Sequence, residues 1–406
     1  MWIPRLLEAR LRRLAATRPV VVVTGARQTG KTALVRHLFP EHAYVTLDLP
    51  SEAAQAESDP QAFLARHPRP LIVDEVQYAP GLFRHLKVVV DRERDSAGQF
   101  LLTGSQPFLL LQGVAESLAG RAAIVQLEGL SLWEIAAALP DLSWSERLLR
   151  GGFPELYARR EIDPADFHRS YVATYLERDL RSQLQVSSLH DFERVVRAVA
   201  LRSAQLLNRA ELARDVGISG STAGSWLSLL ERSGMVALLE PWFGNATRRM
   251  IKSPKLYLAD CGLMAWLLGL GDDADLQRSP LLGAVWETQV VGELRRLLAA
   301  GGDPARLHFW RDRNREVDVV LERGGRFWLG DAKWSELPAP ADARRLRQVA
   351  AELPRGSVAA MALLCRAPHP YPLGEGVDAL PPEALGEAWG LVPAGERDAC
   401  RHGWRT

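Results

Sequence analysis

A glycine-rich stretch near the start of the chain has the spacing of a phosphate-binding loop. Residues 25–32 spell GARQTGKT, which fits GxxxxGK[ST], and they follow the apolar run Val20–Val23 and precede a helical pattern at Ala33–Phe39. Glycines let backbone N–H groups surround phosphates, and the N-terminus of the following helix favours negative charge. Lys31 is expected to reach the β- and γ-phosphates, and the Thr32 hydroxyl to join Mg²⁺. We expect ATP to be bound by Gly25, Ala26, Arg27, Gln28, Thr29, Gly30, Lys31 and Thr32.

Two acidic residues end a later apolar run. Leu71–Val73 is followed by Asp74 and Glu75. Asp74 is expected to hold Mg²⁺, and Glu75 to orient and deprotonate the attacking water, as ATP hydrolysis requires.

The next two apolar runs carry further candidates. Thr103 and Ser105 end the run that begins at Phe100, where hydroxyls would contact a γ-phosphate. Arg121 precedes the run Ala122–Val125 and is a candidate arginine finger acting on a neighbouring chain's nucleotide. A plain surface role for Arg121 is equally compatible with the sequence.

In this order, the segments GARQTGKT, LIVDEVQ, LLTGSQ and SLAGR resemble the AAA+ superfamily. They are similar in particular to prokaryotic proteins that join an archaeal-type AAA+ ATPase to a C-terminal domain of unknown function. The resemblance implies a P-loop α/β fold that binds and hydrolyses ATP with Mg²⁺. Ala26 and Ala33 differ from the Pro and Thr common in that family, and neither is a phosphate ligand.

A third group of reactive residues surrounds Gly324-Gly325. The flanking segments have strand-like alternation, and a two-residue turn at these glycines places Asp318 opposite Asp331 and Glu316 opposite Lys333. Facing carboxylates repel, so a folded protein tolerates them when a cation lies between them or when the edge is solvated.

With Glu287 on the preceding helical pattern, D-x₁₂-D-x-K resembles the PD-(D/E)xK nuclease superfamily. The resemblance implies that Glu287, Asp318 and Asp331 bind Mg²⁺ and that Lys333 activates water toward a phosphodiester. Asp331 replaces the more common Glu. The alternative is a nuclease-like domain that binds nucleic acid or protein without cleaving it.

Residues 207–236 predict a helix-turn-helix, with Gly217 at the turn. Apolar runs around Gly244-Asn245 would supply a wing whose basic residues are Arg248, Arg249, Lys252 and Lys255. The second helix lacks Arg and Lys over Ser221–Glu231, which favours a structural or backbone-contacting role over base recognition.

The elements that must position these residues change along the chain. Strand-like and helical patterns alternate up to residue 135, which predicts a parallel α/β sheet. The acidic, Pro-ended stretch Gly271–Pro280 is typical of a linker. We expect an ATPase core (1–135), a helical lid or connector (136–190), a winged-helix domain (191–270), a PD-(D/E)xK nuclease-like α/β domain (281–366) and a Pro/Gly-rich tail (367–406).

The composition limits the choice of partners. The 50 basic and 49 acidic residues leave a net charge of +1, so any nucleic-acid surface must be local. Only five of the basic residues are lysines, which points to positions where a compact ammonium is needed. No apolar run approaches the ~18 residues that a membrane span needs, and no signal-peptide core is present. The three scattered cysteines suit a reducing compartment, so we expect a cytoplasmic protein.

These patterns predict an AAA+ ATPase whose nuclease-like domain cuts or binds DNA or RNA. One alternative is an ATP-dependent switch whose C-terminal domain only docks partners, and another is a winged-helix DNA-binding regulator. A homo-oligomer is expected if Arg121 acts on a neighbour's nucleotide.

Overall fold

A five-stranded sheet forms the N-terminal part of the computed structural model, which describes residues 1–105, 107–175, 189–243 and 253–392. All neighbouring strands are parallel, in the order β2-β3-β4-β1-β5. The strands are β1 (Val20–Thr24), β2 (Ala43–Thr46), β3 (Leu71–Asp74), β4 (Phe100–Gly104) and β5 (Ala122–Gln126). The predicted parallel α/β sheet is confirmed.

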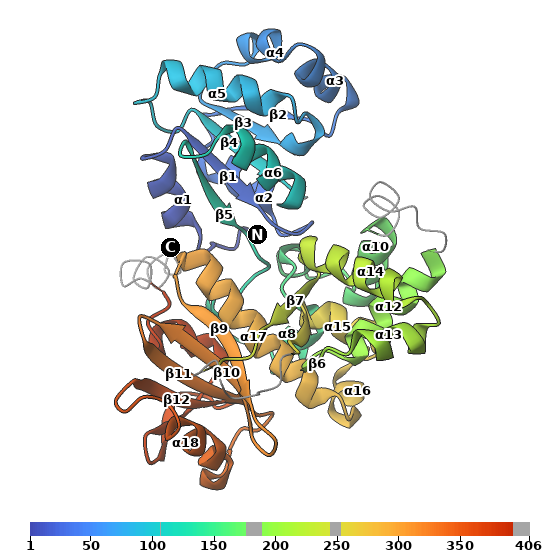
Figure 1. Cartoon of the computed structure of the whole chain (residues 1–406), viewed down its shortest axis with the longest axis vertical. Helices are drawn as coiled ribbons and strands as arrows, with labels where there is room; N and C mark the ends of the chain where they lie inside the picture. Colours follow the sequence, from blue (N-terminus) through green and yellow to red (C-terminus); the bar gives the residue numbers. More distant parts are fainter. Residues whose placement is uncertain (106, 176–188, 244–252, 393–406) are drawn as a thin grey trace.

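Helices cover both faces of this sheet, because its central strands are apolar on both sides (Figure 1). Val21 and Val23 face α1 (Glu8–Ala15) and α2 (Lys31–Leu38). Val20 and Val22 face the other layer. That layer contains α3 (Pro50–Ser58), α4 (Pro60–Arg66), α5 (Leu82–Arg92) and α6 (Pro107–Ser117), with the short helix η1 (Val76–Tyr78) after β3.

The middle part is mainly helical. Its first helices are α7 (Leu132–Ala138), α8 (Trp144–Arg150), α9 (Pro154–Ala158) and α10 (Pro164–Tyr175). A small antiparallel sheet, ordered β6-β8-β7, accompanies the next helices. These elements are α12 (Leu189–Leu201), β6 (Gln205–Leu206), α13 (Arg209–Val216), α14 (Gly220–Arg232), β7 (Val236–Leu239) and β8 (Lys255–Leu258), followed by α15 (Cys261–Leu267) and α16 (Asp273–Arg278).

The two helices of the predicted helix-turn-helix are present as α13 and α14. Asn208 and Ser219 cap them through their side chains, and Gly217 ends α13 at a φ of 81°. Residues 244–252, which include Arg248, Arg249 and Lys252 of the predicted wing, lie outside the described residues.

The predicted linker at 271–280 is wrong, because this stretch contains α16. Asp272 caps this helix by accepting the backbone N–H of Asp275, and Leu276 is buried. The acidic residues that suggested a linker therefore begin a helix instead.

The C-terminal part is a long helix followed by a six-stranded sheet ordered β13-β14-β12-β11-β10-β9. Its elements are α17 (Leu282–Gly301), β9 (Arg306–Arg311), β10 (Glu316–Arg323), β11 (Arg326–Ala332), η3 (Pro340–Ala343), α18 (Arg344–Ala350), β12 (Val358–Leu364), β13 (Tyr371–Gly374), β14 (Val377–Leu380), η4 (Pro382–Ala384) and α19 (Leu385–Ala388).

The sheet continues into the segment predicted as a tail from residue 367. Pro372 lies in the edge strand β13, where a missing N–H is tolerated, and Gly374 and Gly376 lie at the turn into β14 with φ of 96° and 74°. The Pro and Gly content that suggested a tail thus marks an edge hairpin, and the predicted boundary at residue 366 is too early.

Helix α17 lies between the three parts, and Figure 1 shows it crossing the centre of the molecule below the N-terminal sheet. It contacts β5, α8, α15 and β11. One apolar core includes side chains from the middle helices, α17 and the C-terminal sheet. Among the described helices, none has the length and apolar character needed to cross a membrane.

Candidate functional site

The glycine-rich loop connects β1 to α2 and depends on two unusual backbone positions. Gly25 has a φ of 151°, and a Cβ there would lie 2.1 Å from the carbonyl oxygen of Leu127. Gly30 precedes α2 with a φ of 89°. The Lys31 Nζ donates to the carbonyl oxygens of Gly25, at 3.1 Å, and Ala26, at 2.7 Å. The ammonium therefore lies across the loop that was predicted to bind phosphate.

The two predicted magnesium ligands of this site are in direct contact. Thr32 Oγ1 donates to Asp74 Oδ1 at 2.7 Å, and Tyr44 donates its hydroxyl to Asp74 Oδ2 at 3.1 Å. The Thr103 hydroxyl also donates to Asp74 Oδ1. Hydroxyl and carboxylate oxygens suit Mg²⁺, so the donor set fits this ion.

Glu75 lies beside this pair, at a positive φ of 53° immediately after β3. Its Oε2 accepts the Ser105 hydroxyl at 2.8 Å, the Ser105 N–H at 3.1 Å and the Gln77 amide. Burial raises the pKa of Glu75, but the bonds from Gln77 and Ser105 and the charge of Lys31 outweigh it and leave the pKa below its ordinary value. Glu75 is therefore ionised at neutral pH and able to accept a proton.

Arg121 does not join this site in its own chain. It directly precedes β5, and Ala122 pairs with Val20, so Arg121 lies at the opposite edge of the sheet from the loop that follows β1. Its Nε and Nη2 bond the two carboxylate oxygens of Asp91 at 2.6 and 2.8 Å.

A second group of charges surrounds Lys255, the first residue of β8. Its side chain is 1% exposed, and its Nζ bonds Glu287 Oε1 at 2.7 Å and Asp318 Oδ1 at 3.2 Å. Glu316 Oε1 also contacts this ammonium. Lys255 was predicted on a wing for nucleic acid, and that placement is wrong because the side chain is buried among carboxylates of the C-terminal part.

The predicted register is confirmed over Val319–Arg323 of the hairpin, where Leu321 pairs with Trp328, and the backbone pairing ends one residue before Asp318 and Asp331. Asp318 and Asp331 are neighbours across it: the Asp318 N–H donates to Asp331 Oδ1 at 3.2 Å, and Asp318 Oδ2 accepts the Ala332 N–H at 3.0 Å. Burial and the Asp318 charge raise the pKa of Asp331 to about 8. The same two causes raise the pKa of Glu287 to about 8 against the opposing charge of Lys255. Both shifts favour the protonated, neutral form of the carboxyl at neutral pH.

The structure does not bring Lys333 to these carboxylates. Its side chain is 48% exposed, and its Nζ bonds Asp342 Oδ1 at 3.0 Å. The predicted contact between Lys333 and Glu316 is wrong, because β11 ends at Ala332 and Glu316 contacts Lys255 and Arg311 instead. Within the described parts of the chain, no three His, Cys, Asp or Glu side chains are arranged to hold a metal ion. Sequence reasoning missed Lys255 as a member of this group, although the scarcity of lysine had singled it out.

Helix α17 connects this group to the N-terminal part. Glu287 lies near its beginning, whereas Glu293 accepts the N–H groups of Leu132, at 2.5 Å, and Trp133, at 3.3 Å, at the start of α7. Arg295 contacts Glu128 at 3.4 Å, just beyond β5. One helix thus contributes Glu287 to the group around Lys255, and it contributes Glu293 and Arg295 to contacts with the segment that follows β5.

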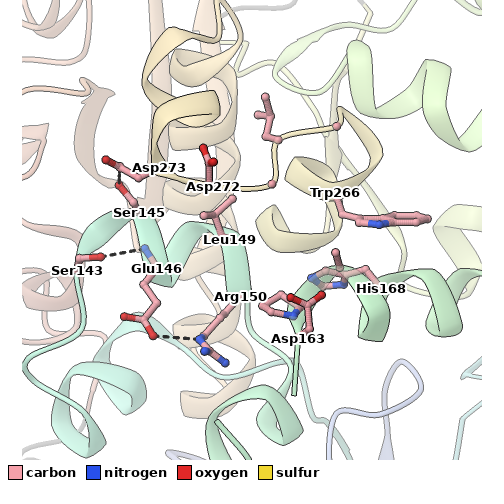
Figure 2. Close-up of a pocket in the computed structure, with 15 residues that line it drawn as sticks. Ser143, Ser145, Glu146, Leu149, Arg150, Asp163, His168, Trp266, Asp272 and Asp273 are labelled. Atoms are coloured by element: carbon pink, nitrogen blue, oxygen red, sulfur yellow. Dashed lines mark hydrogen bonds and ion pairs between the residues drawn. The ribbon is translucent and has the colours of Figure 1, made fainter. Parts of the chain in front are cut away.

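A separate cavity of about 530 Å³ lies in the middle part, and Figure 2 shows His168 and Trp266 on one of its sides. Burial lowers the pKa of His168, which leaves the imidazole neutral. Two of the acidic groups lining it cap helices: Asp163 accepts the Asp166 N–H, and Asp272 begins α16. One carboxylate oxygen of each is engaged in helix capping, and we assign this cavity no chemistry.

Three family profiles match consecutive stretches of the chain. They are an AAA domain over residues 17–136, a domain of unknown function (DUF8612) over 141–274 and a domain of unknown function (DUF4143) over 282–385. Among solved structures, the Walker-type ATPase PABY2304 of Pyrococcus abyssi is similar, with 17% identity and a TM-score of 0.43 over 66% of this chain and 96% of that chain. The Thermotoga maritima RuvB Holliday junction branch migration motor has 17% identity and a TM-score of 0.29 over 57% of this chain and 85% of its own.

Two curated relatives are much closer in sequence. The uncharacterized protein Rv2008c of Mycobacterium tuberculosis is 36% identical over 382 residues, which are 93% of this chain and 83% of the relative. The uncharacterized protein Mb2031c of Mycobacterium bovis has the same identity and coverage. The chain therefore belongs to the same family as these two mycobacterial proteins, and its N-terminal part is an AAA domain.

Proposed function

We propose that the protein binds ATP with Mg²⁺ and hydrolyses it beside the glycine-rich loop. The observation that carries this proposal is the contact of Thr32, in the first turn of α2, with Asp74 at the carboxyl end of β3, where Glu75 follows. Mg²⁺ would neutralise phosphate charge, held by Thr32 and Asp74. Lys31 would exchange the loop carbonyls for phosphate oxygens, which are stronger acceptors for an ammonium.

Glu75 is proposed as the base that takes a proton from the attacking water. Its lowered pKa keeps it ionised, and the two Ser105 bonds to Oε2 hold the carboxylate in one orientation while leaving Oε1 for the water. The contact from Thr103 to Asp74 and the position of Ser105 support the predicted role of both hydroxyls near the γ-phosphate.

Two substitutions in the full chain separate binding from hydrolysis. Lys31→Ala is expected to abolish ATP binding, whereas Glu75→Gln should keep ATP bound and slow turnover by a factor of roughly 10²–10⁴. Fluorescent nucleotide titration and phosphate release measure the two effects. Glu41→Gln, which changes an exposed carboxylate, is the control. Undiminished turnover in Glu75→Gln would refute the assigned role.

The C-terminal carboxylates support a second candidate activity, a Mg²⁺-dependent nuclease-like site that cuts or binds nucleic acid. Glu287, Asp318 and Asp331 come from α17, β10 and β11, and two of them have a pKa raised to about 8. Mg²⁺ prefers carboxylate oxygens as ligands, and these three side chains would have to rearrange to share one ion. The surface position of Lys333 leaves its predicted part in the chemistry without support from the geometry.

Incubation of the full chain with Mg²⁺ and either plasmid or single-stranded DNA tests this second activity. Cleavage by the wild type that Asp318→Ala abolishes would support it, and cleavage that survives Asp318→Ala would exclude these carboxylates. DNA bound without cleavage would favour the docking alternative. Lys333→Ala serves as the matched control, since its ammonium lies outside the carboxylate group.

The order α12-β6-α13-α14-β7-β8 supports the winged-helix interpretation of the middle part. Its second helix, α14, has no basic residue before Arg232, so a backbone-contacting or structural role is proposed. Binding to one specific DNA sequence without ATP would favour the regulator instead.

Arg121 remains a candidate finger only toward a neighbouring chain, because of its distance along the sheet from its own loop. An ATP-dependent oligomer in light scattering would support that role, and a monomer under both conditions would exclude it.

A further inference from the structure

The ammonium of Lys255 fills the space between the carboxylates where the proposed divalent cation would bind. Glu287 and Glu316 contact this ammonium together with Asp318, and all three belong to the C-terminal part, whereas β8 belongs to the middle part. We propose that Lys255 is a tethered cation that occupies the carboxylate site and excludes divalent ions until the ammonium is withdrawn. This inference rests on the proposed carboxylate function and concerns its regulation.

The ammonium makes hydrogen bonds to Glu287 and Asp318 and an ion pair with Glu316. A lysine ammonium has three N–H donors, and Lys255 has three carboxylate partners. With carboxylates on three sides, Lys255 in this position acts as a counter-ion to them.

A metal ion and this ammonium exclude each other. Mg²⁺ binds oxygen at about 2.0–2.1 Å, so an ion shared by Glu287 Oε1 and Asp318 Oδ1 would lie close to the present Nζ, which is 2.7 and 3.2 Å from these oxygens. Two cations about 3 Å apart repel strongly even at an effective dielectric constant of about 20. Metal binding by these two carboxylates therefore requires the lysine to move.

Strand pairing fixes the backbone of Lys255. This residue pairs with Leu206 of β6 on one side and with Leu239 of β7 on the other. The ammonium therefore leaves the carboxylates when its side chain turns away or when β8 is displaced.

A strand pair connects β8 to the nucleotide loop and provides a route for that displacement. The turn before β7 contains Gly234, where an added Cβ would lie 3.6 Å from the Ala26 Cβ of the glycine-rich loop. Leu239, at the other end of β7, pairs with Lys255. A change in the loop that shifts the Gly234 turn would therefore move the strand pair that holds Lys255.

Mn²⁺ binding to the nucleotide-free full chain tests the proposal, by electron paramagnetic resonance. Lys255→Met removes the charge and keeps the length of the side chain. It is expected to create one Mn²⁺ site that binds roughly a hundredfold or more tightly than in the wild type, because a like charge nearby is gone. Adding Asp318→Asn should abolish this site. Lys87→Met, at an exposed lysine, is the control.

A second variant serves as a folding control, since Lys255→Met removes the ammonium from Glu287 and Asp318, whereas Glu316 keeps its contact with Arg311. Lys255→Met combined with Glu316→Gln removes one negative charge and keeps Glu287 and Asp318 for the metal. Mn²⁺ should raise the thermal midpoint of both variants and leave that of the wild type unchanged. Folded variants that bind Mn²⁺ no better than the wild type would overturn the proposal. Neither measurement depends on catalysis, so a new metal site without DNA cleavage would support the tethered cation and count against the nuclease activity alone.

Discussion

The carboxyl of Glu293 offers a test of how the C-terminal helix supports the start of α7. Glu293 is fully buried, and its two oxygens accept the N–H groups of Leu132 and Trp133. Burial raises its pKa from 4.5 to about 8. We predict that Glu293→Gln, which keeps the shape but cannot ionise, makes the protein more stable than the wild type at alkaline pH.

The sign of the pH dependence of the free energy of unfolding follows from the proton that Glu293 retains in the folded state. Below about pH 4.5 the carboxyl is protonated in both states and contributes nothing to the pH dependence. Between about pH 4.5 and 8 the unfolded chain ionises first, so the free energy of unfolding falls as the pH rises, and above about 8 the loss is complete. A shift from 4.5 to about 8 corresponds to about 5 kcal/mol, at about 1.4 kcal/mol per pKa unit.

Urea unfolding at pH 5, 7 and 8.5, followed by tryptophan fluorescence, measures this effect. Glu293→Gln and the wild type should differ little at pH 5, because both side chains are then neutral. By pH 8.5 the variant should be more stable by several kcal/mol, on the order of the shift above. Glu41→Gln, at the surface, should show no such trend. A difference that stays constant with pH, or a variant that weakens at high pH, would mean that Glu293 is an ionised cap of α7 and would refute the reasoning.

Two further predictions concern the nucleotide loop and the surface lysine. Gly25→Ala places a Cβ 2.1 Å from the Leu127 carbonyl oxygen. Nucleotide titration should therefore show loss of binding, and the thermal midpoint of the protein should fall. Retained affinity for the nucleotide would contradict the loop geometry. Lys333→Ala removes a half-exposed contact to Asp342, so the free energy of unfolding should change by less than about 1 kcal/mol, and Mn²⁺ binding in the Lys255→Met background should not change. Loss of that Mn²⁺ site would return Lys333 to the carboxylate group.

The sequence predicts most reliably where the interacting residues lie on one short segment. The loop around Lys31 is contiguous, and the Gly324-Gly325 turn sets the pairing of the hairpin on either side of it, so the neighbouring positions of Asp318 and Asp331 follow from local rules. The same turn also predicted that Lys333 would lie opposite Glu316. That prediction failed because the strand ends before Lys333.

Contacts between separate parts of the chain could not be predicted in this way. Lys255 reaches Glu287 and Asp318 from another sheet, and no periodicity in its own segment specifies where that sheet lies. The burial of Lys255 could not be predicted either, because lysine side chains are usually exposed and are buried only when they are paired. The edge hairpin formed by β13 and β14 was missed for a different reason: Pro and Gly are common both in tails and at the edges of sheets.

The shared apolar core has a consequence for how the chain can be divided. The match to the first domain of unknown function ends at residue 274 and the second begins at 282, yet side chains from both regions belong to one core, in which Trp286 is fully buried. A fragment that ends between residues 274 and 282 would expose the apolar side chains of this core to water and would tend to aggregate. The two regions should therefore unfold in a single cooperative transition and should be expressed as one block.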